Sequence, residues 1–256
     1  MVPVVYDPVI VSVVVPLLDE AENLPRLHAE IVDAMTDLDV GWEVVYVDDG
    51  SRDKGPRILS QLADLDSRVQ VVTLDRNYGQ STAMIAGAEA AFGDWIATLD
   101  ADGQNDPKDI PRMWTVISRQ KVDGVTGVRV DRADGWVKRF ASRIANDVRN
   151  RVLGDEITDV GCSTRIFPKD AILGAARFEG MHRFLPTLVR AGGFRIEELP
   201  VNHRPRIAGR SKYGINNRLW CGIADLLMVR RLLRRRIRYQ TKEATVVQST
   251  RLGAWL

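Results

Sequence analysis

The residues of this chain best suited to chemistry are acidic side chains that directly follow apolar segments. Asp100 and Asp102 come after the segment WIATL, and Gln104 follows them. Two carboxylates two residues apart, with a side-chain amide two residues further on, offer the hard oxygen ligands that Mg²⁺ and Mn²⁺ prefer. A cation held there can bridge a diphosphate and neutralise the charge that grows on it as it leaves. The alternative is a turn whose aspartates cap the next helix.

Two further acidic pairs occupy equivalent places. Asp48 and Asp49 follow the segment WEVVYV and precede Gly50, which allows the chain to turn sharply. A carboxylate here can accept hydrogen bonds from a nucleobase or a ribose, although capping of the following helix is the alternative. Asp19 and Glu20 follow the first apolar segment, and on their own they are typical of a helix cap.

The elements that must position these residues are visible in the hydrophobic pattern. β-branched segments alternate with helical patterns through the first half of the chain. Strands are predicted at 9–15, 42–47, 69–74, 95–99 and 124–128, and helices at 23–38, 54–65, 81–92 and 107–119. This alternation predicts an α/β fold with a mostly parallel sheet and helices on both faces. Ligands bind beyond the carboxyl ends of such strands, where the acidic pairs fall.

The second half of the chain is less regular. A strand is predicted at 195–201 and two amphipathic helices at 136–152 and 216–236. The first helix carries an apolar stripe of Trp136, Phe140, Ile144 and Val148 beside basic residues, and the second combines leucines with arginines. Either helix could lie in a lipid interface or pack on the sheet, and the second could instead form a dimer contact.

Composition limits the class of protein. With 256 residues, 45% apolar and 27% charged, the chain suits one core with a short appendage. We expect a catalytic domain at 1–215 and a basic amphipathic helix and tail at 216–256. Two cysteines without a CxxC pair exclude a disulfide scaffold and fit a reducing compartment. We expect no membrane span and no signal peptide, because no stretch of about 18 apolar residues and no cleavage signal is present.

The net charge of +2 conceals a gradient along the chain. Residues 203–238 contain 11 Lys or Arg and one acidic residue, Asp225, so they carry +10 and the remainder carries −8. This asymmetry indicates an anionic partner on one face, with an ordinary solvated helix as the alternative. Nucleic acid is not expected, because no aromatic side chains are interleaved with the basic ones on an exposed strand.

Four segments in this order resemble the inverting glycosyltransferases of family 2, which have the nucleotide-sugar-binding GT-A fold, a Rossmann-like α/β architecture. The matching segments are VVPLLDEAENL, VVYVDDGSRD, RNYGQSTAMIAGAEAAFGDWIATLDADGQNDP and RPRIAGRSKYG. More narrowly, the chain is similar to the polyprenyl-phosphate glycosyltransferases, which include dolichol-phosphate mannose synthase and bacterial undecaprenyl-phosphate sugar transferases. The resemblance covers roughly residues 9–236. Where the family has Asp-Pro-x-Ser-Gly, this chain departs from it and has Asp159-Val-Gly-Cys-Ser163.

The resemblance implies a role for each matching residue. The metal and the donor diphosphate would be held by Asp100, Asp102 and Gln104, with Asp102 the most critical residue. The nucleoside pocket would be lined by Pro16, Asp19, Glu20 and Asp48 or Asp49. The acceptor phosphate would be bound by Arg129, by one of Lys138 and Arg139, and by Ser142. The loop that closes over the donor phosphates would carry Arg206, Ser211 and Lys212.

The implied function is transfer of a sugar, with inversion, from a GDP- or UDP-sugar to a polyprenyl monophosphate, assisted by Mg²⁺ or Mn²⁺. A peripheral protein on the inner face of the cytoplasmic membrane is expected, with a homo-oligomer through the final helix as a further possibility. Two alternatives are a transferase with a polysaccharide or small-molecule acceptor, and a non-catalytic scaffold. The first requires a base carboxylate beyond the metal motif, for which that stretch offers only Asp159. His182 and His203 are expected to be structural.

Overall fold

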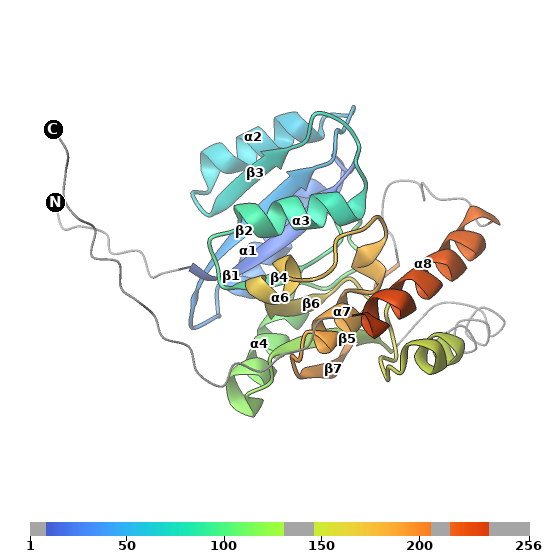
Figure 1. The fold of residues 1–256 in the computed structure, drawn as a ribbon. Helices are drawn as coiled ribbons and strands as arrows, with labels where there is room; N and C mark the ends of the chain where they lie inside the picture. Colours follow the sequence, from blue (N-terminus) through green and yellow to red (C-terminus); the bar gives the residue numbers. More distant parts are fainter. Residues whose placement is uncertain (1–8, 131–145, 206–215, 236–256) are drawn as a thin grey trace, which may run out of the picture.

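A computed structural model describes residues 9–130, 146–205 and 216–235. Within these ranges seven strands form one sheet in the order β3-β2-β1-β4-β6-β5-β7 (Figure 1). The strands are β1 (Val9–Leu17), β2 (Gly41–Asp48), β3 (Val69–Thr73), β4 (Trp95–Thr98), β5 (Gly124–Arg129), β6 (Arg165–Pro168) and β7 (Ile196–Val201). Strand β6 runs antiparallel to its neighbours β4 and β5, and every other pair is parallel. The predicted mostly parallel sheet is therefore confirmed.

Helices cover both faces of the sheet because side chains of β1 alternate between two apolar clusters. Val11, Val13 and Val15 are fully buried on the face covered by α1 (Leu24–Met35), α2 (Gly55–Leu65) and α4 (Asp109–Gln120). Val14 faces the opposite cluster, formed by α3 (Gln80–Ala90), α6 (Lys169–Leu173) and α7 (Leu185–Ala191). Figure 1 shows α3 and α6 on the near side of the sheet. The alternation follows from the two-residue period of a strand.

The second half contains elements that the hydrophobic pattern did not indicate. β6 has four residues, and both α6 and the 3-10 helix η1 (Met181–Arg183) span a single turn or so. Segments this short are below the length at which a period can be recognised. The helix predicted from Pro107 begins instead at Asp109, because Pro107 and Lys108 form a turn in which the Asp109 N–H donates to the Asp106 carbonyl (3.0 Å).

The C-terminal helix α8 (Asn216–Arg234) confirms the final predicted helix and has two different faces. Val229 is fully buried, and Leu226 and Leu233 pack against the cluster that contains α3 and α7. Leu227, Met228 and Leu232 are exposed instead, as are Arg231 and Arg234 on the helix and Arg235 directly after it. One face of α8 therefore packs on the core while the other presents apolar and basic side chains.

Of the helix predicted at 136–152, residues 146–153 are helical and residues 136–145 lie outside the described ranges. Val148, the last member of the predicted stripe, is 48% exposed. Among the described residues, no helix is both long and apolar enough to cross a membrane.

Helix α3 approaches the sheet closely at Gly87. A Cβ atom at this position would lie 2.4 Å from Val14 Cγ1 and 2.8 Å from Val47 Cγ2. Both valines are fully buried in the sheet, so neither has room to move away.

We therefore expect Gly87→Ala to lower the free energy of unfolding by about 1–3 kcal/mol, as overpacked cores do. Chemical denaturation followed by circular dichroism measures the change. Thr82→Ala, on the exposed side of the same helix, is the matched control and is expected to change stability by about 0.5 kcal/mol or less. Equal stability of Gly87→Ala and the wild type would contradict the close packing of α3.

Candidate active site

A cleft of about 570 Å³ lies at the carboxyl ends of the central strands. The parallel pairing of β1 with β2 sets Leu17 opposite Asp48, and the pairing of β1 with β4 sets Val14 opposite Thr98. The strand ends therefore meet at one edge, as expected for a parallel sheet. Seven of the predicted site residues line this main cleft: Pro16, Glu20, Asp49, Asp100, Asp102, Gln104 and Arg129.

The two carboxylates of the predicted metal motif are close enough to influence each other. Burial, and then the charge of Asp102, raise the pKa of Asp100. The Gln80 side-chain amide donates to Asp100 Oδ1 (2.7 Å), and the Gln104 backbone N–H donates to Asp102 Oδ1 (3.1 Å). Two facing carboxylates in a buried setting favour a bound cation, because the cation removes their mutual repulsion.

The donor set fits a hard divalent cation but is incomplete by itself. Among the described residues, no group of three or more His, Cys, Asp or Glu side chains could hold a metal ion. Asp100 and Asp102 therefore need further oxygen ligands, which Gln104, water or a diphosphate can supply. The Gln104 amide nitrogen donates to the Arg204 carbonyl (3.4 Å), which ties this side chain to the segment after β7.

The acidic pairs after β1 and β2 brace two neighbouring loops. Asp19, with a φ of 47°, accepts from the Arg52 N–H through Oδ1 (2.7 Å). Asp48 Oδ1 accepts from the Ser51 N–H (2.9 Å). Neither of these two aspartates lines the main cleft in the described part of the chain. They hold the loops that shape the predicted nucleoside pocket, and direct contact with a nucleoside stays a prediction.

Asp49 and Glu20 do line the cleft, and each has a structural partner. The Asp49 carboxylate accepts from the backbone N–H groups of Tyr78 (2.7 Å) and Gly79 (2.8 Å) at the start of α3. Glu20 Oε2 accepts from Asn23 Nδ2 (2.7 Å) just before α1. Asp49 therefore braces the loop that leads into α3, and it does not cap the helix that follows it in sequence.

Arg129, at the end of β5, brings positive charge to the same cleft. Its Nε and Nη2 donate to Asp159 Oδ2 (2.8 Å) and Oδ1 (2.9 Å). Burial alone lowers the pKa of Arg129, but the hydrogen bonds and charge of Asp159 outweigh it, so the pKa lies above its usual value. Arg129 is therefore a fixed cation that lines the same cleft as Asp100 and whose charge acts to lower the pKa of that carboxyl.

Sequence reasoning did not identify Arg165, at the start of β6, as a site residue. It lines the cleft and is only 4% exposed. Its Nη1 donates to the His182 carbonyl (2.6 Å) and its Nη2 to the Val160 carbonyl (2.8 Å). Burial lowers its pKa to about 10, so Arg165 remains charged at neutral pH. Its position becomes apparent only when β6 is placed between β4 and β5.

His182 lines the cleft as a neutral side chain. Burial, and then the charges of Arg165 and Arg183, lower its pKa to about 3. Ser81 Oγ accepts from the N–H groups of Gly180 (3.0 Å) and His182 (3.4 Å), so its own proton is directed to His182 Nδ1 (2.8 Å). This network assigns the Nε2–H tautomer. The structural role expected for His182 agrees with its contact to α3.

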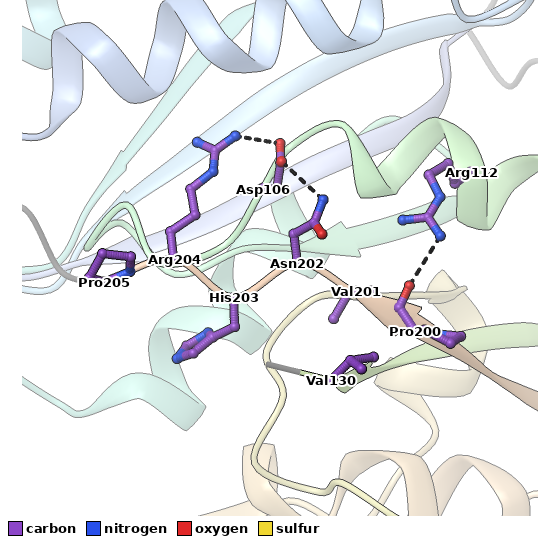
Figure 2. Close-up of a pocket in the computed structure, with 9 residues that line it drawn as sticks. All are labelled: Asp106, Arg112, Val130, Pro200, Val201, Asn202, His203, Arg204 and Pro205. Carbon is purple, nitrogen blue, oxygen red and sulfur yellow. Dashed lines mark hydrogen bonds and ion pairs between the residues drawn. The ribbon is translucent and has the colours of Figure 1, made fainter. Parts of the chain in front are cut away.

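A second hollow of about 560 Å³ lies beside the main cleft (Figure 2). In Figure 2 the side chains of Arg204 and Asn202 both point to Asp106. Arg204 Nη2 lies 2.7 Å from Asp106 Oδ1, and its Nη1 lies 2.7 Å from Glu30 Oε2. The ion pair between Arg204 and Asp106 therefore holds the segment after β7 against the loop after β4.

Six predicted residues lie outside the described ranges: Lys138, Arg139, Ser142, Arg206, Ser211 and Lys212. Their roles stay predictions. The described part of the cleft therefore includes the predicted metal motif, part of the predicted nucleoside pocket and one of the cations predicted to bind the acceptor.

Comparison with known families identifies this architecture. A family model described as glycosyl transferase family 2 matches residues 12–173, which include the loops after β1, β2 and β4. The chain belongs to this family, and the expected GT-A fold is confirmed.

The chain is similar to two curated relatives. It is 39% identical over 206 residues to undecaprenyl-phosphate 4-deoxy-4-formamido-L-arabinose transferase of Edwardsiella ictaluri, covering 80% of this chain and 63% of the relative. It is 38% identical over 232 residues to dodecaprenyl-phosphate galacturonate synthase of Rhizobium johnstonii, covering 89% and 68%. The chain thus spans less than two thirds of the first relative's length.

A solved structure supports the fold. Glucosyl-3-phosphoglycerate synthase from Mycobacterium tuberculosis, in complex with Mg²⁺ and uridine diphosphate, matches with a TM-score of 0.63 and 17% sequence identity. The match covers 86% of this chain and 79% of that one. At this identity the likeness concerns the arrangement of strands and helices.

The buried state of His182 predicts a pH dependence of stability. Its pKa is about 3 in the folded state and near the ordinary value of 6.5 once unfolded. Unfolding therefore takes up a proton between these values, so this contribution to stability is complete above pH 6.5. It is lost as the pH falls, by on the order of 1 kcal/mol per pH unit.

We expect the His182 ring protons to show no titration between pH 8 and 5 in an NMR experiment. His182→Asn, which keeps a polar atom near Nδ1, is expected to flatten the fall of stability below pH 6.5. His28→Asn is the matched control, because burial also lowers the pKa of His28. This variant leaves the His182 contribution in place. A ring titration midpoint above pH 6 would contradict the buried neutral state.

Proposed function

We propose that this chain transfers a sugar from a nucleoside diphosphate sugar to a polyprenyl monophosphate, with inversion at the anomeric carbon. The observation that carries the proposal is one cleft lined by two interacting carboxylates, Asp100 and Asp102, and by two cations, the partly buried Arg129 and the buried Arg165. Such a cleft suits the joining of two anionic substrates. The named activities of the two curated relatives support the same substrate classes.

The acceptor chemistry needs no strong base. A phosphate monoester oxygen is already anionic at neutral pH, unlike a sugar hydroxyl. This oxygen attacks the anomeric carbon, the bond from that carbon to the diphosphate oxygen breaks, and the bonding electrons leave with the nucleoside diphosphate. Arg129 binds and orients the acceptor phosphate, with Lys138 or Arg139 and Ser142 as proposed further contacts.

On the donor side, Asp100, Asp102 and Gln104 would hold Mg²⁺ or Mn²⁺ next to the donor diphosphate. When bound, the cation supplies positive charge that stabilises the leaving diphosphate. Pro16, Glu20 and Asp49 line the nucleoside end of the cleft, and Arg206, Ser211 and Lys212 are proposed to contact the donor phosphates. The charge of Arg165 favours the ionised form of Asp100 and so lowers the cost of gathering two carboxylates at one place.

We extend the proposal to the location of the chain, a peripheral position at the inner face of the cytoplasmic membrane. Leu227, Met228 and Leu232 are 56%, 36% and 40% exposed on α8, beside exposed arginines. A helix face of this kind binds the interface of an anionic bilayer, with basic residues near the surface contributing about 1 kcal/mol each. A homo-oligomer through the same face is the competing arrangement.

We expect purified protein with Mn²⁺ to transfer label from a nucleotide sugar to polyprenyl phosphate, measured by extraction into organic solvent. Asp102→Asn is expected to reduce kcat/KM about 100- to 1,000-fold, because it removes negative charge from the metal site. Chelation is expected to abolish transfer, and added Mn²⁺ or Mg²⁺ to restore it. Asp64→Asn, on the exposed side of α2, is the matched control. Full turnover by Asp102→Asn would contradict the metal assignment.

Flotation with vesicles tests the membrane surface. We expect binding to phosphatidylglycerol-containing vesicles to fall at least about tenfold when Leu227, Met228 and Leu232 are all replaced by Gln, because the buried apolar area is lost. Leu65→Gln is the control, since Leu65 is 85% exposed on α2, away from α8. Unchanged flotation with a concentration-dependent loss of self-association would assign this face to a homo-oligomer instead.

A further inference from the structure

We propose that Asp159 and Gly161 are positioning residues that fix the Arg129 guanidinium in the orientation that receives the acceptor phosphate. The inference rests on the proposed function, in which Arg129 binds that phosphate. In the loop before β6, which carries Asp159-Val-Gly161, both the aspartate and the glycine then serve to position Arg129.

Asp159 holds Arg129 through both carboxylate oxygens. Oδ2 accepts from the Arg129 backbone N–H (3.2 Å) and Nε (2.8 Å), and Oδ1 accepts from Nη2 (2.9 Å) and from the Gly161 N–H (3.2 Å). The Asp159 side chain is 4% exposed and that of Arg129 is 20% exposed. A bidentate pair with this degree of burial fixes the plane of the guanidinium as well as its position.

These contacts use the Nε and Nη2 nitrogens of the Arg129 guanidinium and leave its third nitrogen, Nη1, for another partner. Nη1 is the guanidinium nitrogen that has no hydrogen bond to the described part of the chain. Arg129 lines the main cleft together with Gly161. A phosphate oxygen can therefore approach Nη1 without displacing Asp159, and the ion pair and the ligand contact can exist together.

Gly161 provides the space in which the guanidinium lies. A Cβ atom at this position would be 2.6 Å from Arg129 Nη2, which is closer than real contacts allow, and 3.5 Å from Asp159 Oδ1. Gly161 shows no positive φ, so its backbone conformation admits alanine. Because the colliding atom is at the end of a side chain, Gly161→Ala displaces the guanidinium and leaves the fold intact.

These contacts separate two roles for Asp159. A general base needs an oxygen lone pair that faces the acceptor, whereas the Asp159 oxygens accept four N–H groups. Asp159 therefore acts through Arg129. Its replacement is expected to change acceptor binding and to leave the pH profile of kcat unchanged.

The test is a double-mutant cycle of Gly161→Ala and Arg129→Ala, with KM measured separately for acceptor and donor. We expect Gly161→Ala to raise the acceptor KM about tenfold, which corresponds to about 1.4 kcal/mol, with the donor KM and the melting temperature unchanged. In the Arg129→Ala background, Gly161→Ala is expected to have no further effect, because the atom it displaces is gone. Asp159→Asn is expected to raise the acceptor KM and to retain the acidic limb of the pH profile, which a general base at this position would produce.

An unchanged acceptor KM in Gly161→Ala, additive effects in the cycle, or loss of the acidic limb in Asp159→Asn would each overturn the inference. A readout independent of turnover is the ¹⁵N–H resonance of Arg129 Nε, assigned by its loss in Arg129→Lys. We expect Gly161→Ala to shift this resonance, and an unshifted resonance would overturn the positioning role. If the wild type transfers nothing to polyprenyl phosphate, the proposed function fails while the resonance still tests the positioning.

Discussion

The arrangement of the main cleft depends on one buried amide, Asn105, which is 4% exposed. Its Oδ1 accepts from the Asp100 N–H (3.1 Å) and from Ser163 Oγ (3.0 Å), while its Nδ2 donates to Thr164 Oγ1 (2.8 Å). An isolated bridge to His203 adds the segment after β7. A buried amide that loses such partners costs roughly 1–3 kcal/mol per unsatisfied group, so these three segments are held together as a unit. The carboxylates after β4 and the loop before β6 thereby keep a fixed relation.

The segments that Asn105 holds together bring opposite charges into one cleft, where each charge has a partner or an opposite charge near it. Asp100 and Asp102 lie on the loop after β4, and the cations Arg129 and Arg165, whose charges act on Asp100, come from β5 and β6. Each arginine has its own acceptors, a carboxylate for Arg129 and backbone carbonyls for Arg165. The charges are therefore arranged before substrates arrive, and no large rearrangement of dipoles is needed during the reaction. For a reaction between two anions, this prior arrangement is the main contribution that a protein can make.

The sequence was sufficient to predict the first half of the fold, because long β-branched strands alternate with helices and each acidic pair directly follows a strand. It was insufficient for β6 and η1, whose three or four residues show no period, and so Arg165 and His182 were not recognised as residues of the cleft. The pattern also could not separate Asp49, which lines the cleft, from Asp48, which braces the Ser51 turn, because adjacent residues of a strand end point in opposite directions. One face of α8 packs on the core, as its composition allowed, and the interface role of the exposed face stays a prediction.

We propose that Asp100 and Asp102 form an incomplete cation site that a diphosphate completes. Electron paramagnetic resonance of free Mn²⁺ reports directly on this site, because the signal of the ion falls when it is bound. We expect weak Mn²⁺ binding by the protein alone and at least about tenfold tighter binding when a nucleoside diphosphate is added, beyond what the nucleotide binds by itself. Asp102→Asn is expected to remove this gain. Mn²⁺ binding that is unaffected by the nucleotide, or that persists in Asp102→Asn, would contradict the account.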